Sequence, residues 1–326
     1  MYFNNILPII SALVLSLGLN YLFMYLFIKM NFVDNPDGIL KPHKASVPLS
    51  GGIAIALTFL ILEMVFKIPI NPFILIIPYL FLLLGMKDDI NNLNPYIRLF
   101  LEFLFIIPLF LLKTYLWLDL PLFISVIFSY ILIIGFINSF NLMDGIDGLS
   151  GSLAIVALLS FTFLAPSDVC GDIRIINCAF IPAIIGFLYL NLYPAKTFLG
   201  DGGAYFIGFM IVYEVILINV SFNLPLFLAS LYMIGIFIFD TFFAMTRRLI
   251  LKKSIFGGDR SHIYDILHSG GLSIPGTVMI MVVLQILFSF VGFAVSRVSI
   301  PVSIIISIST IIICSIMGLV YLKRNL

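Results

Sequence analysis

Long apolar stretches, separated by short polar connections, run along the whole chain. Most are close to the roughly 20 residues that a helix needs to cross a bilayer. Two joints, at 66–69 and 220–223, are so tight that two stretches could be mis-split. The pattern predicts an all-α fold, a polytopic membrane bundle of 10 to 11 transmembrane helices that forms a single domain over residues 1–326. The stretches cover residues 6–28, 49–66, 69–86, 96–113, 118–137, 149–165, 174–190, 203–220, 222–245, 274–296 and 300–322.

The composition supports a membrane protein. Of the 326 residues, 62% are hydrophobic and 10% are charged, against roughly 25% charged in soluble domains. The mean hydropathy is +1.21, so lipid must solvate much of the outer surface. The net charge of +1 gives no support to nucleic-acid binding, which usually shows as a basic excess. Three scattered cysteines indicate neither a disulfide framework nor a zinc site.

The positive charges predict the orientation of the chain. Connections between successive spans alternate between two sides, and thirteen of the 17 Lys and Arg residues fall on one of them. Cytoplasmic loops of membrane proteins carry an excess of Lys and Arg. The bias predicts an external N-terminus, a cytoplasmic C-terminus and a multi-pass protein of the cell (inner) membrane.

The acidic residues gather on the same side as the basic ones. Carboxylates do little to orient a membrane protein, so these acids need another explanation. Oxygen-rich clusters at a membrane surface suit Mg²⁺ or Mn²⁺, which bind through one or two carboxylates together with substrate phosphates. The acids in these loops and helix ends are Asp34, Asp37, Asp88, Asp89, Asp144, Asp147, Asp201, Asp259 and Asp265.

Three acidic segments lie at the ends of predicted helices. Asp88 and Asp89 end the third helix, where their charge opposes the helix macrodipole, and this conflict favours a functional role. Asp144 with Asp147, and Asp201 further along, precede helices and stand among glycines. Free N–H groups and the dipole at such N-termini favour phosphate, and glycine permits close backbone approach. The alternative is that these aspartates cap helices, but two such loops and an acidic pair are hard to obtain by capping alone.

Two further loops on this side carry basic and imidazole groups. In the longest polar connection, His262 and Asp265 lie three residues apart, and the neighbouring Arg260 can fork onto a diphosphate. The first loop, with Lys41 and His43, is either a basic patch attracted to anionic lipid or a phosphate contact. The chain contains no G-x-x-x-x-G-K-[ST] and no G-x-G-x-x-G motif, which argues against ATPases and dinucleotide enzymes.

In their order along the chain, these segments form a set of motifs that covers nearly its whole length. The motifs are Asp34-x-Pro36, Lys41-x-His43, Pro48-x-x-Gly51-Gly52, Gly85-x-x-Asp88-Asp89, Asn141-x-x-Asp144-Gly145-x-Asp147-Gly148-Leu149, Phe198-x-Gly200-Asp201-x-Gly203, Asp240-Thr241 with Arg247-Arg248, and Asp259-Arg260-x-His262. The set resembles that of the polyprenyl-phosphate N-acetylhexosamine-1-phosphate transferase superfamily, glycosyltransferase family 4. This superfamily includes bacterial undecaprenyl-phosphate GlcNAc-1-phosphate transferases, the phospho-MurNAc-pentapeptide translocase and the eukaryotic dolichyl-phosphate enzyme.

The resemblance implies a phosphoglycosyl transferase with its catalytic loops in the cytoplasm. Such an enzyme moves GlcNAc 1-phosphate, or a related N-acetylhexosamine 1-phosphate, from a UDP-sugar to a polyprenyl phosphate and releases UMP. This reaction is the first membrane step of cell-envelope glycan synthesis and requires Mg²⁺ or Mn²⁺. The resemblance is also compatible with an enzyme that forms a homodimer. Carried over by motif, the residues are Asn141 and Asp201 as metal ligands, Asp88 and Asp89 as the catalytic acid pair, Asp144 and Asp147 at the nucleotide, and Lys41, His43, Arg260 and His262 as phosphate and sugar contacts.

The chain departs from the family pattern at two places. The usual His-x-His-His stretch reads His262-Ile263-Tyr264-Asp265. Because a run of histidines is associated with the peptidoglycan branch, this departure predicts UDP-GlcNAc rather than UDP-MurNAc-pentapeptide as the donor. Lys87 also places a cation directly before the acidic pair. Direct attack by the acceptor phosphate is the favoured mechanism, and a phospho-aspartate at Asp88 is the alternative.

Two other classes of membrane protein compete with this interpretation. A CDP-alcohol phosphatidyltransferase needs D-G-x-x-A-R, whereas Asp144-Gly145 is followed here by Ile146-Asp147. A secondary transporter would place polar groups near the bilayer midplane. Among the acids inside predicted spans, Glu63, Glu102 and Glu214 outline no pathway.

Overall fold

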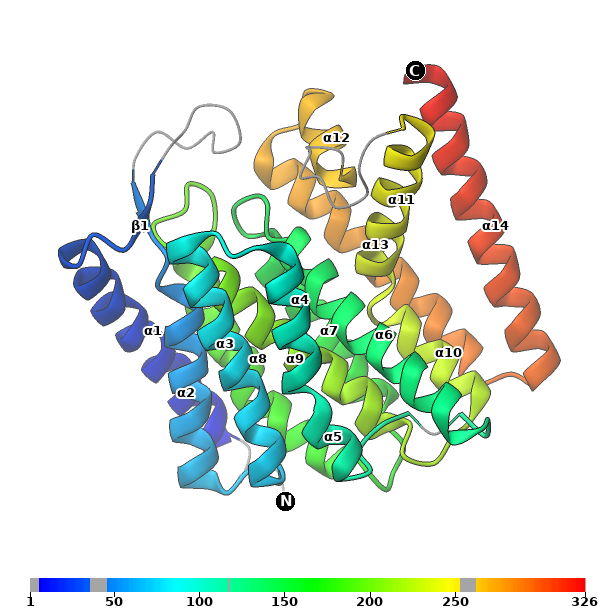
Figure 1. The fold of residues 1–326 in the computed structure, drawn as a ribbon, viewed down its shortest axis with the longest axis horizontal. Helices are drawn as coiled ribbons and strands as arrows, with labels where there is room; N and C mark the ends of the chain where they lie inside the picture. Colours follow the sequence, from blue (N-terminus) through cyan, green and yellow to red (C-terminus); the bar gives the residue numbers. More distant parts are fainter. Residues whose placement is uncertain (1–5, 36–45, 117, 253–261, 326) are drawn as a thin grey trace.

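The computed structural model describes residues 6–35, 46–116, 118–252 and 262–325, which form an almost entirely helical bundle (Figure 1). One antiparallel pair of two-residue strands, with Val33 opposite Pro48, is the exception within these residues. The all-α prediction is confirmed. The elements are α1 (Ile6–Lys29), β1 (Val33–Asp34), β2 (Val47–Pro48), α2 (Gly51–Phe66), α3 (Pro72–Asn91), α4 (Pro95–Phe105), α5 (Ile107–Leu111), α6 (Leu122–Leu142), α7 (Leu149–Leu164), α8 (Cys170–Asn191), α9 (Gly200–Ile218), α10 (Leu224–Tyr232), α11 (Gly235–Ile250), α12 (Ile263–Ser269), α13 (Ile274–Val295) and α14 (Ile300–Asn325).

Fewer helices meet the length and composition expected of a membrane span than the sequence predicts. In the described part of the chain, six helices are long and apolar enough to cross a bilayer, and α10 with α11 makes a seventh if this bent pair counts as one span. The expected 10 to 11 spans are therefore not supported. The remaining stretches are helical but fall short, because α2 and α7 have only 16 residues and α4 ends at Phe105. α3 carries Lys87, Asp88 and Asp89 within its last turns.

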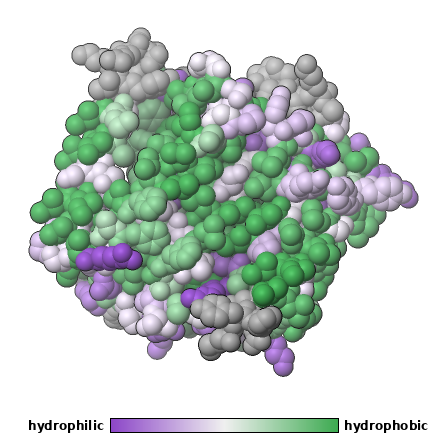
Figure 2. Space-filling view, turned by 180° about the vertical axis from the view of Figure 1, so that it is seen from behind, coloured by the Kyte–Doolittle hydropathy of each residue, from purple (hydrophilic) through white to green (hydrophobic). Residues whose placement is uncertain are grey.

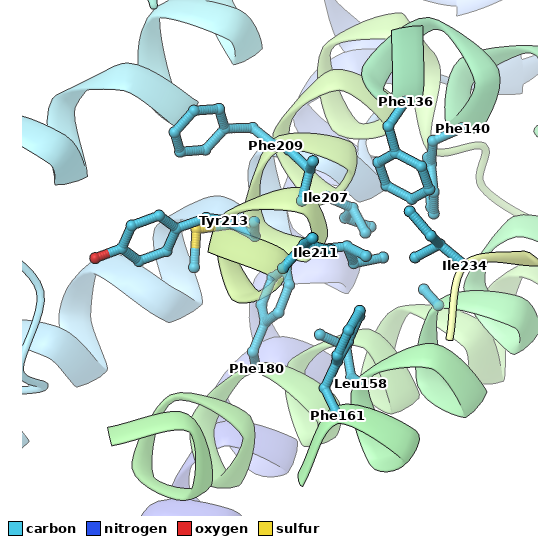
Figure 3. Close-up of a cluster of buried hydrophobic side chains, with 14 of the residues drawn as sticks. Phe136, Phe140, Leu158, Phe161, Phe180, Ile207, Phe209, Ile211, Tyr213 and Ile234 are labelled. Carbon is cyan, nitrogen blue, oxygen red and sulfur yellow. The ribbon is translucent and has the colours of Figure 1, made fainter. Parts of the chain in front are cut away.

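α9 is the central helix of the bundle. It is apolar all round and buried along almost its whole length, as expected for a helix surrounded by others. It packs against α2, α3, α6, α7 and α10. In Figure 3 its side chains reach to opposite sides, with Phe209 and Tyr213 on one side and Ile207 and Ile211 on the other. This packing holds the N-terminus of α9 in a defined place at one end of the molecule.

Glycines let α2 and α3 approach α9 very closely. A Cβ atom on Gly52 would lie 2.4 Å from the Cα atom of Gly203, and one on Gly85 would lie 2.3 Å from the backbone nitrogen of Gly202. Small residues at helix contacts allow such close backbone packing in membranes. The glycines of these motifs therefore serve helix packing. At Gly202 and Gly203, the space that a side chain would occupy is filled by α3 and α2.

The outer surface is apolar. Large hydrophobic side chains such as Tyr25, Phe73 and Phe163 are exposed, the last by 78%. Figure 2 shows apolar residues over most of one face of the molecule. A surface of this kind requires lipid, since monomeric soluble proteins rarely expose large contiguous apolar patches. The protein is a multi-pass membrane protein.

The acidic segments lie at one end of the bundle. The strand pair, α12 and the C-terminus are at this end, and the N-terminus is at the other (Figure 1). The C-terminal end of α3, the loop at 143–148 and the N-terminus of α9 also reach it. The helix order thus brings together segments that are far apart along the chain: Asp89 and Asp201, which are 112 residues apart, are in contact.

Candidate active site

Asp89 occupies the N-terminus of α9. Its Oδ1 atom accepts a hydrogen bond from the Asp201 N–H at 3.0 Å, and its carboxylate also bonds the N–H of Gly202. An acid at this position is favoured by the helix dipole. Burial, followed by the nearby charge of Asp201, raises the pKa of Asp89 to about 7. The free N–H groups that the sequence assigned to phosphate at this helix end are thus taken, in part, by an internal carboxylate.

Asn141 and Asp201 lie side by side, although 60 residues separate them in the chain. The Asn141 Nδ2 atom donates to Asp201 Oδ1 at 2.8 Å. Asn141 comes from the last turn of α6 and Asp201 from the first turn of α9. The two side chains are therefore adjacent, and both carry oxygen atoms of the kind that bind Mg²⁺.

The loop at 143–148 brings a third carboxylate to this end. Asp144 accepts a hydrogen bond from the Ser150 hydroxyl. Burial, together with the charges of Asp201 and Asp147, raises the pKa of Asp144 to about 7. Mutual repulsion among Asp89, Asp144 and Asp201 favours either a proton or a cation among them.

Asp147 anchors the same loop to the segment that precedes α9. Its Oδ2 atom accepts from the Ala195 N–H at 2.9 Å. The next residue, Gly148, has a φ of +78° and donates its N–H to Asn191 Oδ1 at 3.0 Å. A left-handed φ at this turn favours glycine. At least one oxygen of Asp147 thus has a structural role.

Asp88 points to a different partner from its neighbour Asp89. Its Oδ2 atom lies 2.9 Å from Nη1 of Arg98, and its Oδ1 atom accepts from the Leu93 N–H at 2.7 Å. The Arg98 Nε atom is 3.8 Å from Oε1 of the fully buried Glu102. Asp88 is therefore one end of a buried ion-pair network between α3 and α4.

The same network extends to α6 and α9. Asn138 donates from Nδ2 to Glu102 Oε2 at 2.7 Å. The Arg98 guanidinium carbon lies 6.0 Å from the centroid of the Tyr205 ring, a distance at which a cation is attracted to an aromatic face. Arg98 thus connects the end of α3 to the helix that carries Asp201.

His262 is held by a carboxylate of α11. The Asp240 Oδ2 atom lies 2.6 Å from His262 Nδ1, and Asp240 Oδ1 accepts from the Ile263 N–H at 2.6 Å. The His262 ring stacks on that of Tyr264 at 5.6 Å between centroids. The Tyr264 hydroxyl donates to the carbonyl of Leu142 at 3.0 Å. His262 is thereby brought next to the loop that carries Asp144.

Sequence comparison identifies the group of enzymes to which this arrangement belongs. Residues 71–219 match glycosyl transferase family 4. The undecaprenyl-phosphate α-N-acetylglucosaminyl 1-phosphate transferase of Thermotoga maritima is 33% identical over 267 residues, which make up 81% of this chain and 82% of its own. The chain belongs to glycosyl transferase family 4. It is a phosphoglycosyl transferase of the polyprenyl-phosphate N-acetylhexosamine-1-phosphate transferase superfamily.

Other relatives of this family 4 transferase differ in the share of the chain to which they align. A Bacillus subtilis protein named as a probable undecaprenyl-phosphate N-acetylglucosaminyl 1-phosphate transferase is 27% identical over 312 residues, 89% of this chain and 85% of its own. The phospho-N-acetylmuramoyl-pentapeptide-transferase of Rubrobacter xylanophilus is 37% identical over only 125 residues, 37% of this chain and 38% of its own. The resemblance that the motifs indicated is confirmed.

The structure of the transferase brings together several, but not all, of the residues that its sequence marks out. Asp89, Asn141, Asp144 and Asp201 converge, whereas Asp88 turns toward Arg98. Asp147 and His262 bind neighbouring segments at the same end, and the candidates Lys41, His43 and Arg260 lie outside the described residues.

Sequence reasoning missed the roles of Arg98, Glu102 and Asp240. Arg98 is one of the thirteen basic residues that predict the orientation of the chain, although its spacing of four residues from Glu102 on a helix also indicates a pair. Asp240 stood in a motif without a role, although a lone carboxylate in an apolar stretch calls for a polar partner.

The donor set of the transferase fits a hard divalent cation that also binds substrate. No group of three or more His, Cys, Asp or Glu side chains in the described part of the chain could hold a metal ion by itself. Mg²⁺ usually binds through one or two carboxylates plus substrate phosphates and waters. Asp201 with the amide oxygen of Asn141, next to the acids Asp89 and Asp144, matches this incomplete set.

The ion pair of Asp88 has a testable consequence for stability. We expect Arg98→Met to lower the free energy of unfolding of the transferase by about 3–5 kcal/mol, because a buried carboxylate loses its charge partner. Asp88→Asn in the Arg98→Met background should restore part of the loss. Thermal unfolding in detergent measures both, with Arg297→Met, at an exposed arginine, as the control. Equal stability of Arg98→Met and the parent would show that the pair contributes nothing.

Proposed function

We propose that this transferase moves GlcNAc 1-phosphate, or a close N-acetylhexosamine 1-phosphate, from a UDP-sugar to a polyprenyl phosphate. UMP is the second product, Mg²⁺ is required, and the site faces the cytoplasm. The observation that carries the proposal is the convergence of Asp89, Asn141, Asp144 and Asp201 at one end of the bundle. The names of the Bacillus subtilis and Thermotoga maritima relatives support the acceptor and the sugar.

The chemistry requires alignment more than acid–base work. A phosphate monoester has a second pKa near 6, so the acceptor phosphate is already a nucleophile at neutral pH. Its oxygen attacks the sugar-bearing phosphorus of the donor, and the bond between that phosphorus and the bridging oxygen breaks. UMP leaves with that oxygen. Holding two such groups in line can contribute about 7–11 kcal/mol to lowering the barrier.

The residues divide the work among the reacting groups. Asn141 and Asp201 would hold Mg²⁺, which supplies neutralisation of the diphosphate charge. Asp89 orients the start of α9 beneath them through its bond to the Asp201 N–H. Asp144 and Asp147 would contact the nucleotide. Lys41, His43, Arg260 and His262 would contact phosphate and sugar.

Asp88 favours direct attack over a covalent intermediate. Both of its carboxylate oxygens already accept hydrogen bonds, one from Arg98 and one from the Leu93 N–H. An aspartate nucleophile would have to leave this buried ion pair before it could attack phosphorus. A positioning role at the end of α3 requires no such movement.

An apolar groove between α10, α11, α13 and α14 would accept the prenyl chain. α10 and α11 meet at a bend of 72°, and a groove with a volume of about 540 Å³ opens beside it. Phe239, Phe242, Phe288 and Ile311 are among its lining residues. α11 also carries Asp240, so one helix would join the chain groove to the site.

The reaction itself is tested with purified protein, undecaprenyl phosphate and radiolabelled UDP-GlcNAc. We expect release of UMP and formation of a labelled lipid diphosphate. Efficient turnover of UDP-MurNAc-pentapeptide in the same assay would overturn the choice of sugar. Turnover of a CDP-alcohol substrate, or transport of substrate without UMP release, would favour the other two classes.

The cytoplasmic location of the site predicts a labelling pattern. Single cysteines replace Lys44, Asp168 or Ser254 in a variant that lacks the three native cysteines. In intact cells, an impermeant thiol reagent should label position 168 and leave positions 44 and 254 unlabelled until the membrane is opened. Labelling of 44 or 254 with protection of 168 would reverse the orientation.

The acids with raised pKa values predict how pH affects the metal requirement. Asp89 and Asp144 have pKa values of about 7, so a cation among these groups competes with protons. We expect the Mg²⁺ concentration for half-maximal UMP release to fall as the pH rises from about 6 to about 8. A half-maximal concentration that is constant across this range would contradict proton competition at the site.

A further inference from the structure

Asp240 is a buried carboxylate that makes two short hydrogen bonds to one segment. Its side chain is 1% exposed and that of His262 is 4% exposed. One oxygen takes the Ile263 N–H and the other faces His262 Nδ1, each at 2.6 Å. His262 is the N-cap residue of α12, so Asp240 fastens the start of that helix to α11.

This arrangement determines how the imidazole can be used. A carboxylate is an acceptor, so Nδ1 carries the proton in this pair. In the neutral ring the lone pair then belongs to Nε2. Because Nδ1 is engaged, Nε2 is the nitrogen through which a ligand could bind His262.

The ring is also held by its face. His262 stacks on Tyr264 with 6° between the ring planes, and the Tyr264 hydroxyl is bound to Leu142. A Cβ atom on Gly145 would lie 2.0 Å from that hydroxyl oxygen, so only glycine leaves room for it. Tyr264 therefore couples the ring of His262 to the loop that carries Asp144.

We propose that Asp240 is a positioning residue for sugar-phosphate transfer, which fixes the tautomer and orientation of His262 so that Nε2 meets the nucleotide-sugar donor. The proposal rests on the proposed function in its choice of ligand. It does not require Asp240 to touch substrate. Residues that orient metal-binding histidines typically change metal affinity or activity by about 10–100-fold when they are replaced, and we expect an effect of this size for Asp240.

Asp240→Asn separates this role from simple anchoring. An asparagine keeps an oxygen for one donor, but its amide N–H₂ group can donate to Nδ1 and so favour the tautomer with the proton on Nε2. We expect UMP release to fall by about 10–100-fold in Asp240→Asn. In a His262→Ala background, the same substitution should cost less than about threefold, because Asp240 then has no ring to orient.

The matched control is Ser139→Ala. The Ser139 hydroxyl donates to the Phe237 carbonyl at 2.7 Å and lies 2.6 Å from the Thr241 hydroxyl. Its loss removes a buried contact of α11 beside Asp240 without touching His262. Turnover of this variant should stay within about threefold of the parent. Equal losses from Asp240→Asn with and without His262 would reduce Asp240 to an anchor of α12 and overturn the proposal.

A spectroscopic readout is independent of turnover. The chain has three histidines, and the ¹⁵N signals that disappear in His262→Gln belong to His262. At pH 8 the parent should show a protonated Nδ1 and an unprotonated Nε2, and Asp240→Asn should reverse them. Unchanged signals in Asp240→Asn would refute the tautomer assignment. Absence of UMP release from the parent would instead refute the proposed function, while the ¹⁵N result would still decide the Asp240–His262 pair.

Discussion

Asp201→Asn should abolish most turnover of the transferase while leaving the fold intact. The asparagine can still accept the hydrogen bond from Asn141, and the backbone N–H that binds Asp89 is unaffected. What it removes is a negative charge at the proposed metal site. Since a bound metal ion supplies several kcal/mol of transition-state stabilisation, UMP release should fall by about 100-fold or more.

The control variant is Asp172→Asn, which removes a carboxylate charge from the start of a different helix. Asp172 also lies in the first turn of a helix, α8, but outside the acidic cluster. Its amide variant should keep turnover within about twofold of the parent. High Mg²⁺ or Mn²⁺ should recover part of the loss in Asp201→Asn. Turnover of Asp201→Asn within a few-fold of the parent, or full activity of the parent in EDTA, would overturn the metal assignment.

Gly85→Ala should disrupt the site through helix packing alone. The added methyl group would meet backbone atoms of Asp201 and Gly202 at 2.3–2.5 Å, and neither backbone can move without shifting α9. Overpacking of this kind costs about 1–3 kcal/mol. It would also separate Asp89 from Asp201, and a displacement of 1 Å in an active site can lower turnover by about 100-fold.

Gly135→Ala provides the matched comparison. Gly135 lies in α6, the helix that carries Asn141, and nothing lies within 4 Å of the position of its Cβ atom. Alanine there should leave UMP release unchanged and stabilise the helix by up to about 1 kcal/mol. Thermal unfolding and UMP release are measured for both variants. If Gly85→Ala matched Gly135→Ala in both measurements, the close contact between α3 and α9 would not be needed.

The sequence predicted where helices form more reliably than it predicted how many of them span the membrane. Each apolar stretch is helical, because apolar side chains in lipid leave the backbone no partner but itself. Whether a helix meets the length and charge required of a span depends on where it breaks. The break in α4–α5 after Phe105 and the charged end of α3 keep these segments from meeting that requirement.

At the site, the acidic pair shows most clearly what the sequence could predict and what it could not. The motifs marked both Asp88 and Asp89 as one functional unit. Successive residues of a helix point about 100° apart, so Asp88 meets Arg98 of α4 while Asp89 meets the start of α9. Adjacency in sequence says nothing about these separate partners.

The sequence by itself determined that this is an all-α membrane protein, which end carries its polar loops and, through the order of its motifs, the family. These properties follow from composition and from patterns within single segments. Only the tertiary structure decided that glycines bring α2 and α3 onto α9, that Asp89 binds the start of α9 and that Asp240 holds His262. Each of these contacts joins segments more than 20 residues apart, and its geometry depends on how whole helices pack against one another.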